Sequence, residues 1–132
     1  MSKLINLRFG LDHVPVASVA QSIAEQGSRY VERVYTAGEI AASQTRGRTD
    51  AGRLAQRFAV KEATLKVLPD ADEGLDFRSI ELTCDASGHL AVVLHGRAAE
   101  LAAASGIDHL AVSVTGDDRL AAAVVAAEVT TR

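Results

Sequence analysis

The feature that most constrains this chain is a charged stretch inside a long predicted helix, which runs from Asp50 to Leu68. The stretch reads Arg57-Phe58-Ala59-Val60-Lys61-Glu62-Ala63-Thr64-Leu65-Lys66. At about 100° per residue, one apolar arc of this helix contains Leu54, Phe58, Leu65 and Leu68. Lys61 projects into the middle of the arc, and Glu62 and Lys66 lie together on its edge, four residues apart.

Charges in an apolar arc need compensation, because burying an ammonium or carboxylate without a partner is energetically costly. The compensating group is an ion, a phosphate, a second subunit or solvent. In one interpretation, Lys61 extends its ammonium to solvent, and Glu62 and Lys66 form an ordinary surface pair. In the other, Glu62 and Lys66 belong to a binding site, and Lys61 belongs to a subunit interface or an internal ion pair. Helix geometry alone leaves both interpretations open.

The composition indicates one domain, 1–132, with a modest core. Hydrophobic residues make up 48% of the chain but aromatic residues only 4%, so much of the apolar content is Ala and Val, which bury little area. A thin core favours oligomerisation. The single cysteine, Cys84, excludes an intramolecular disulfide and a cysteine-based zinc site. It is typical of a reducing compartment. Without an apolar run of about 18 residues or a signal-peptide core, we expect a cytoplasmic protein without membrane contact.

The positive charges are unevenly distributed along the chain. A net charge of −3 argues against nucleic-acid binding by the chain as a whole. Four arginines nevertheless lie between residues 46 and 57, with Asp50 as the only acid; they are Arg46, Arg48, Arg53 and Arg57. They form either a solvated helical face or a basic surface for a phosphate or an acidic protein partner.

The predicted elements indicate an α+β fold with an antiparallel sheet. Strands are expected at 4–12, 77–84, 89–94, 109–115 and 120–129. Helices are expected from Pro15 to near Gly27, at 31–35, from the N-cap Thr36 to Ala42, at 50–68 and at 97–104. The segment 121–127 has helical propensity, but its position after a tight turn favours a strand.

Three common chemistries find no support in the residue spacing. The four histidines show no metal-ligand spacing, no nucleophile elbow surrounds a serine, and no phosphate-binding loop motif occurs. What remains is Asp12 at a strand end, with Glu62 and Lys66 on the long helix. Carboxylates from separate elements are typical ligands of Mg²⁺, which completes its shell with waters and substrate phosphates. A nearby lysine adds positive charge for the same phosphates, which suits phosphoryl transfer.

Four blocks of the sequence resemble one family. The stretch from Arg57 to Lys66 resembles the F-A-x-K-E-A-x-x-K signature of holo-[acyl-carrier-protein] synthase, a 4′-phosphopantetheinyl transferase. Gly10-Leu11-Asp12 resembles the N-terminal G-I/L-D strand of that family. The segment 29–39 resembles its R-F-x-x-R-V/I-L/F-T-x-x-E stretch, and 112–125 resembles its closing strands.

The resemblance implies a small α+β domain, with an antiparallel sheet and a long helix packed on it, that assembles as a homotrimer with sites between subunits. It implies transfer of the phosphopantetheine arm of coenzyme A to a serine of an acyl carrier protein, in fatty-acid or polyketide synthesis. By position, Asp12 and Glu62 would hold Mg²⁺, and Glu62 would help to remove the serine proton. Lys66, Arg53 and Arg57 would contact coenzyme A. The basic segment would suit an acidic carrier.

The chain departs from the family pattern at three places. Arg8 replaces the first glycine of the family's G-x-G-x-D, and the loop 70–74 is acidic where the family has glycines. Gly116 stands where the family has a histidine. These departures motivate an alternative: a catalytically impaired homologue that binds carrier protein or coenzyme A without transfer.

Overall fold

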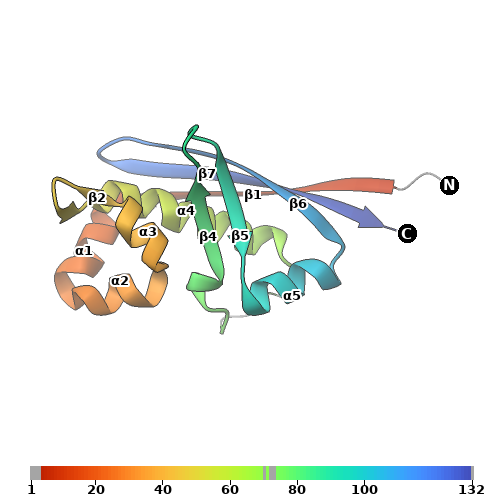
Figure 1. The fold of residues 1–132 in the computed structure, drawn as a ribbon, viewed down its shortest axis with the longest axis horizontal. Coiled ribbons are helices and arrows are strands. Elements are labelled where there is room, and N and C mark those ends of the chain that lie inside the picture. The colour runs from red at the N-terminus through yellow and green to blue at the C-terminus, as the bar shows by residue number, and fades with distance from the viewer. Residues whose placement is uncertain (1–3, 70, 72–73, 132) are drawn as a thin grey trace.

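The computed structural model describes residues 4–69, 71 and 74–131 (Figure 1). The helices are α1 (Val16–Gln26), α2 (Ser28–Val34), α3 (Ala37–Ala42), α4 (Ala51–Val67), α5 (Gly96–Ala104) and the 3₁₀ turn η1 (Phe77–Ser79). The strands are β1 (Leu4–Pro15), β2 (Gln44–Thr45), β3 (Arg48–Thr49), β4 (Ile80–Cys84), β5 (Leu90–Leu94), β6 (Ile107–Gly116) and β7 (Leu120–Thr131).

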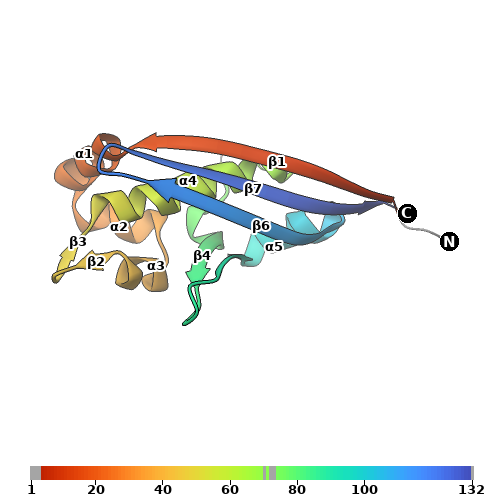
Figure 2. The ribbon, with the colours of Figure 1, turned by 90° about the horizontal axis from the view of Figure 1, so that it is seen from above.

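Three long antiparallel strands form the main sheet, in the order β1-β7-β6. One face of this sheet is covered by α4, as Figures 1 and 2 show. Alternate residues of β7 point toward the helix and are buried; they are Ala121, Ala123, Val125, Ala127 and Val129. Because most of these side chains are small, the helix lies close to the sheet. The expected α+β class, with a long helix packed on an antiparallel sheet, is confirmed.

Gly10 makes this close approach possible. A Cβ atom at this position would lie 1.9 Å from the backbone oxygen of Ala63 on α4. Only glycine fits such a contact between two backbones. The glycine of the Gly10-Leu11-Asp12 motif therefore fixes β1 against the C-terminal half of α4.

The remaining elements cover the other side of α4. As Figure 1 shows, α1, α2 and α3 gather at one end of the sheet, and α5 lies toward the end where the termini are found. The β4–β5 hairpin crosses between them. A second core cluster forms near the end of α4, where α5 packs against β6 and η1; its buried members are Leu68, Leu75, Ile80, Ala98, Leu101 and Ala102.

The structure corrects several predicted boundaries. The first strand continues past Asp12 to Pro15, because its backbone stays paired with β7 as far as Leu120. The expected strand 77–84 begins only at Ile80, since the Asp76 carboxylate caps a 3₁₀ turn by accepting from the backbone N–H of Arg78, 2.9 Å away. The short helical turn expected at 31–35 is the longer helix α2, 28–34. The strand preference for 121–127 is confirmed.

Capping side chains begin α3 and α4 where the sequence indicates. Thr36 and Glu39 form the predicted capping box: the Thr36 hydroxyl accepts from the Glu39 backbone N–H, and the Glu39 carboxylate accepts from the Thr36 backbone N–H, each at 3.1 Å. Asp50 caps α4 by accepting from the N–H groups of Gly52 and Arg53. The buried surface of α4 is wider than the apolar arc expected from the sequence, because other elements pack on both sides of this helix.

Lys61 forms a buried ion pair. Its ammonium donates to the Glu39 carboxylate at 2.6 Å, to the backbone oxygen of Phe77 at 3.0 Å, and to that of Ile80. Both charged side chains are 0% exposed. Burial lowers the pKa of Lys61, whereas the Glu39 carboxylate favours its charged form. The second Glu39 oxygen accepts from the backbone N–H of Leu82. Lys61 therefore ties α4 to α3, η1 and β4, as an internal ion pair rather than a solvent-exposed charge.

Replacing Lys61 by methionine should destabilise the fold by about 3–5 kcal/mol, because Glu39 would keep a buried charge without its partner. Lys66→Met on the same helix is the matched control. Its side chain is 51% exposed, so its pair with Asp12 should contribute less than about 1 kcal/mol. Urea unfolding at one fixed protein concentration measures both. Equal losses for the two variants would contradict the assignment.

Candidate functional site

Asp12 and Lys66 meet where β1 crosses α4. The Lys66 ammonium lies 3.3 Å from the Asp12 carboxylate and donates to the backbone oxygen of Leu11 at 2.5 Å. These groups come together because Gly10 brings β1 onto this turn of the helix. The Leu11 carbonyl was not predicted from sequence, since a backbone acceptor leaves no mark in the residue pattern.

Glu62 lies one turn before Lys66 on α4 and is partly buried. Burial raises the pKa of Glu62, the negative charge of Asp12 raises it further, and the positive charge of Lys66 opposes both. The two carboxylates therefore repel each other across the junction of β1 and α4. A single lysine compensates them only in part.

This arrangement fits a divalent cation. Burial and the negative charge of Asp12 both raise the pKa of Glu62, and a cation held by Asp12 and Glu62 would offset both. In the part of the chain that the structure describes, no group of three or more His, Cys, Asp or Glu side chains gathers around one point. Mg²⁺ is commonly bound by one or two carboxylates, with waters and substrate phosphates as its other ligands, so the donor set suits it.

Within one chain, Arg53 and Arg57 lie on a different side of α4 from Glu62. Rotation by about 100° per residue places Arg53 about 180° from Glu62, and Arg57 about 140° from it. Arg53 is exposed and donates to the backbone oxygen of Ala42 at 3.3 Å. The structure thus joins Asp12, Glu62 and Lys66, and leaves both arginines apart from them.

Arg57 is partly buried beside α2 and α3. One of its terminal nitrogens donates to the backbone oxygen of Arg53 at 3.1 Å, while its buried Nε has no hydrogen-bond partner among the described residues. Burial lowers the pKa of Arg57, and the Glu39 carboxylate opposes that shift. Within the part of the chain that the structure describes, the Arg57 guanidinium is therefore only partly hydrogen-bonded.

Gly116, at the position of the family histidine, packs against Gln56 of α4. A Cβ atom at this position would lie 2.8 Å from Nε2 of Gln56 and 3.2 Å from its Cγ. The two residues line an open groove of about 460 Å³, together with Val16, Asp50, Ala51, Gly52, Arg53, Asp117 and Asp118. Gln56 therefore occupies space that a side chain at 116 would need, a relation that the sequence alone did not reveal.

The other two departures are placed differently. Arg8 is exposed on β1, two residues before the buried Gly10. The acidic residues Asp70, Asp72 and Glu73 lie outside the described residues, so the expectation that this loop repels phosphate stays a prediction.

Among the described residues, no helix is both long and apolar enough to cross a membrane.

A sequence profile described as the 4′-phosphopantetheinyl transferase superfamily matches residues 8–125. The chain belongs to this superfamily. Two holo-[acyl-carrier-protein] synthases, from Edwardsiella ictaluri and Chloroflexus aurantiacus, are 40% and 41% identical to it. Each alignment covers 92% of this chain and 97% of the relative. The resemblance and the expected class, a 4′-phosphopantetheinyl transferase, are therefore confirmed.

Solved structures agree with this membership of the superfamily. A Chronobacterium ammoniagenes ACPS–CoA complex superposes with a TM-score of 0.79 at 28% identity, covering 96% of this chain and 99% of that one. Helicobacter pylori holo-[acyl-carrier-protein] synthase in complex with coenzyme A, at 24% identity and a TM-score of 0.76, shares the fold; it covers 94% of this chain and 100% of that one.

Glu62→Gln should raise the Tm of the metal-free transferase slightly at pH 7, because it removes a carboxylate that burial and Asp12 disfavour. The sign follows from the raised pKa of Glu62. As pH rises from its unfolded-state pKa, 4.5, through its folded-state pKa, the carboxylate ionises and the folded state loses stability. The advantage of the glutamine should therefore vanish below that range. Thermal unfolding between pH 3.5 and 8 tests this, and a lower Tm for Glu62→Gln at pH 7 would contradict it.

Gly116→His should cost about 1 kcal/mol of stability, because the new side chain displaces Gln56. Combining it with Gln56→Ala should remove most of that cost. A double-mutant cycle in urea measures the coupling between the positions, which we expect to exceed about 0.5 kcal/mol. Additive effects of the two changes would show that the contact is unimportant.

Proposed function

We propose that the chain transfers the 4′-phosphopantetheine arm of coenzyme A to a serine of an apo acyl carrier protein, with Mg²⁺ required. The products would be holo carrier protein and adenosine 3′,5′-bisphosphate. One observation carries the proposal: Asp12, Glu62 and Lys66, from two separate elements, lie at one place. Relatives named for the same activity match nearly the whole chain. The proposal treats 1–132 as one transferase domain, and the lone Cys84 suits a cytoplasmic enzyme.

Asp12 and Glu62 would hold the Mg²⁺. When bound, the ion would neutralise negative charge on the transferred phosphoryl group and on the leaving group. The chain supplies the carboxylates in a fixed relation, because β1 is held against α4 through Gly10. Their mutual repulsion in the metal-free protein is consistent with a site built for a cation.

Lys66 would bind the phosphates of coenzyme A as a positive charge. Its ammonium lies 3.3 Å from the Asp12 carboxylate, an ion pair that suits a fixed positive charge rather than a base. Glu62 would also help to remove the proton of the carrier serine. The serine oxygen forms a bond to the phosphorus that carries pantetheine. The bond from that phosphorus to the bridging oxygen breaks, and adenosine 3′,5′-bisphosphate leaves with that oxygen.

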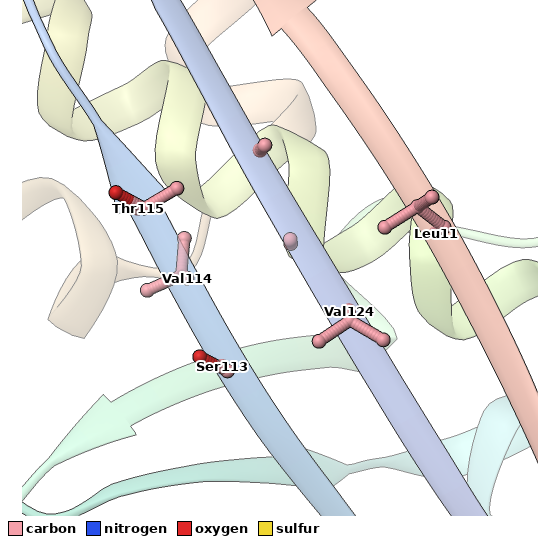
Figure 3. Close-up of a pocket in the computed structure, with 7 residues that line it drawn as sticks. Leu11, Ser113, Val114, Thr115 and Val124 are labelled. Atoms are coloured by element: carbon pink, nitrogen blue, oxygen red, sulfur yellow. The ribbon is translucent and has the colours of Figure 1, made fainter.

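The outer face of the main sheet supports assembly as a homotrimer. Leu7, Phe9 and Leu11 on β1 point away from α4 and are 60%, 65% and 66% exposed. Figure 3 shows Leu11, Val124 and Ser113 side by side across the three strands, lining a shallow apolar hollow. Exposed apolar surface of this kind is typical of protein interfaces. In a trimer with sites between subunits, Arg53 and Arg57 of one copy would contact coenzyme A bound beside the Asp12 of another.

The alternative, a homologue that binds without transfer, rests on Gly116 and on the acidic loop 70–74, whose acids lie outside the described residues. Loss of an imidazole at Gly116 removes one polar group from the groove but leaves Asp12, Glu62 and Lys66 together. A protein that only binds would not need two repelling carboxylates beside a lysine. The arrangement therefore favours transfer.

Incubation with coenzyme A, Mg²⁺ and apo carriers of fatty-acid and polyketide synthesis should give a carrier heavier by one phosphopantetheine in mass spectrometry. Asp12→Asn and Glu62→Gln should each lower kcat/KM at least roughly 100-fold. Sedimentation of both variants checks that the assembly is unchanged. Absence of product with every carrier would overturn the enzymatic proposal, and full activity in either variant would overturn the metal assignment.

A further inference from the structure

The side chain of Gln56 rests on the backbone of Gly116. Gln56 lies on α4, and Gly116 ends β6. A Cβ atom on Gly116 would lie 2.8 Å from Nε2 of Gln56, which is closer than packed atoms approach each other. A side chain at position 116 would therefore displace the carboxamide. In this chain the carboxamide of Gln56 takes the place that such a side chain would use.

The Gln56 carboxamide has hydrogen-bonding capacity that the chain does not use. A carboxamide offers two N–H donors and one oxygen acceptor. Gln56 is partly exposed, and neither its side-chain nitrogen nor its side-chain oxygen has a hydrogen-bond partner among the described residues. Both atoms belong to a residue that lines the open groove beside Gly116. The donors of Gln56 are therefore available to a ligand in that groove.

The charges of the groove make a short-range donor important for an anion. Its lining contains the acids Asp50, Asp117 and Asp118 and the base Arg53. The Asp50 carboxylate accepts from two backbone N–H groups in the first turn of α4, and Asp117 accepts from two in its own turn. These N–H dipoles offset part of the negative charge. Because an excess of acid remains, a phosphate can be held in the groove only by donors in direct contact with it.

Arg53 connects the groove to the proposed reaction. This residue, a proposed contact of coenzyme A, lies one turn before Gln56 on α4, so the two side chains are neighbours on the helix surface. Both line the groove. Figure 2 shows the β6–β7 turn beside α1, at the end of the sheet where α4 begins. The backbone N–H of Val16 holds the turn there by donating to the backbone oxygen of Arg119 at 2.9 Å. A phosphate that reaches Arg53 from the groove therefore also meets Gln56.

We propose that Gln56 donates a hydrogen bond from Nε2 to a phosphate oxygen of coenzyme A and so supplies the polar contact that Gly116 does not; this inference rests on the proposed function. Hydrogen bonds to a charged acceptor are stronger than those between neutral groups, so one amide donor contributes measurably to binding. The polar group has moved from β6 to α4, and the two positions exchange it because they share one space. The glycine at 116 is then compatible with transfer.

Gln56→Met separates the donor from the packing. Methionine has a similar length and keeps the contact with Gly116, but it cannot donate. The Tm should therefore stay unchanged, while the KM for coenzyme A should rise roughly five- to tenfold. Gln56→Glu keeps the shape and sets a negative charge against the phosphate, so it should raise this KM by roughly another tenfold. The KM for apo carrier should not change in either variant. Gln26→Met, at an exposed position of α1, is the matched control for the KM for coenzyme A.

Gly116→His combined with Gln56→Ala returns the polar group to β6. The imidazole then has the space that Gln56 leaves. Gln56→Ala alone should resemble Gln56→Met in its KM for coenzyme A, and the double variant should return to within roughly threefold of the wild-type value. A purely structural role of Gln56 predicts no such recovery at constant Tm. A double variant no better than Gln56→Ala would overturn the exchange between the two positions.

Calorimetric titration with coenzyme A and Mg²⁺, without carrier, measures the same contact in the absence of turnover. Weaker binding by Gln56→Met supports the inference even if transfer fails for every carrier, a result that overturns the proposed function alone. Unchanged KM and Kd for coenzyme A in Gln56→Met would overturn the inference and leave the transferase intact. Binding by Gln56→Glu as tight as that of wild type would overturn the phosphate as the acceptor.

Discussion

The buried ion pair between Lys61 and Glu39 is the interaction on which the site depends. It fixes the rotation of α4 about its own axis, because the ammonium satisfies a carboxylate and two backbone oxygens that lie on one side of the helix. Glu62 follows Lys61 directly and is turned by about 100°. Holding Lys61 toward α3 and β4 therefore turns Glu62 toward β1. A buried charge with a structural role therefore sets the direction of Glu62 at the candidate site.

Close packing on the other side of the helix completes the arrangement. Gly10 lets the β1 backbone touch α4, and this contact brings Asp12 within 3.3 Å of Lys66. The small side chains of β7 allow the same approach along the sheet. The low aromatic content has a structural consequence here, because bulky residues would hold the sheet and the helix apart. Small core side chains therefore let β1 and α4 approach each other at the candidate site.

Several features of the molecule favour function over stability. Two carboxylates face each other without a full counter-charge, Leu7, Phe9 and Leu11 remain exposed, and Arg46 takes a turn position suited to asparagine. Each is unfavourable in an isolated chain. The proposed Mg²⁺ would offset the first, and the proposed further subunits would cover the second.

The sequence by itself determined most of the helix starts and the two hairpins of the second half, and it singled out Asp12, Glu62 and Lys66 as candidates, which the fold brings together. Capping side chains, turn residues and an ordered set of motifs are local signals, so they survive without a structure. Only the tertiary structure decided that Lys61 is internal, that Lys66 binds the Leu11 carbonyl, that Gln56 fills the space at Gly116 and that 44–49 is a hairpin. These depend on contacts between distant segments, which the order of residues along the chain does not specify.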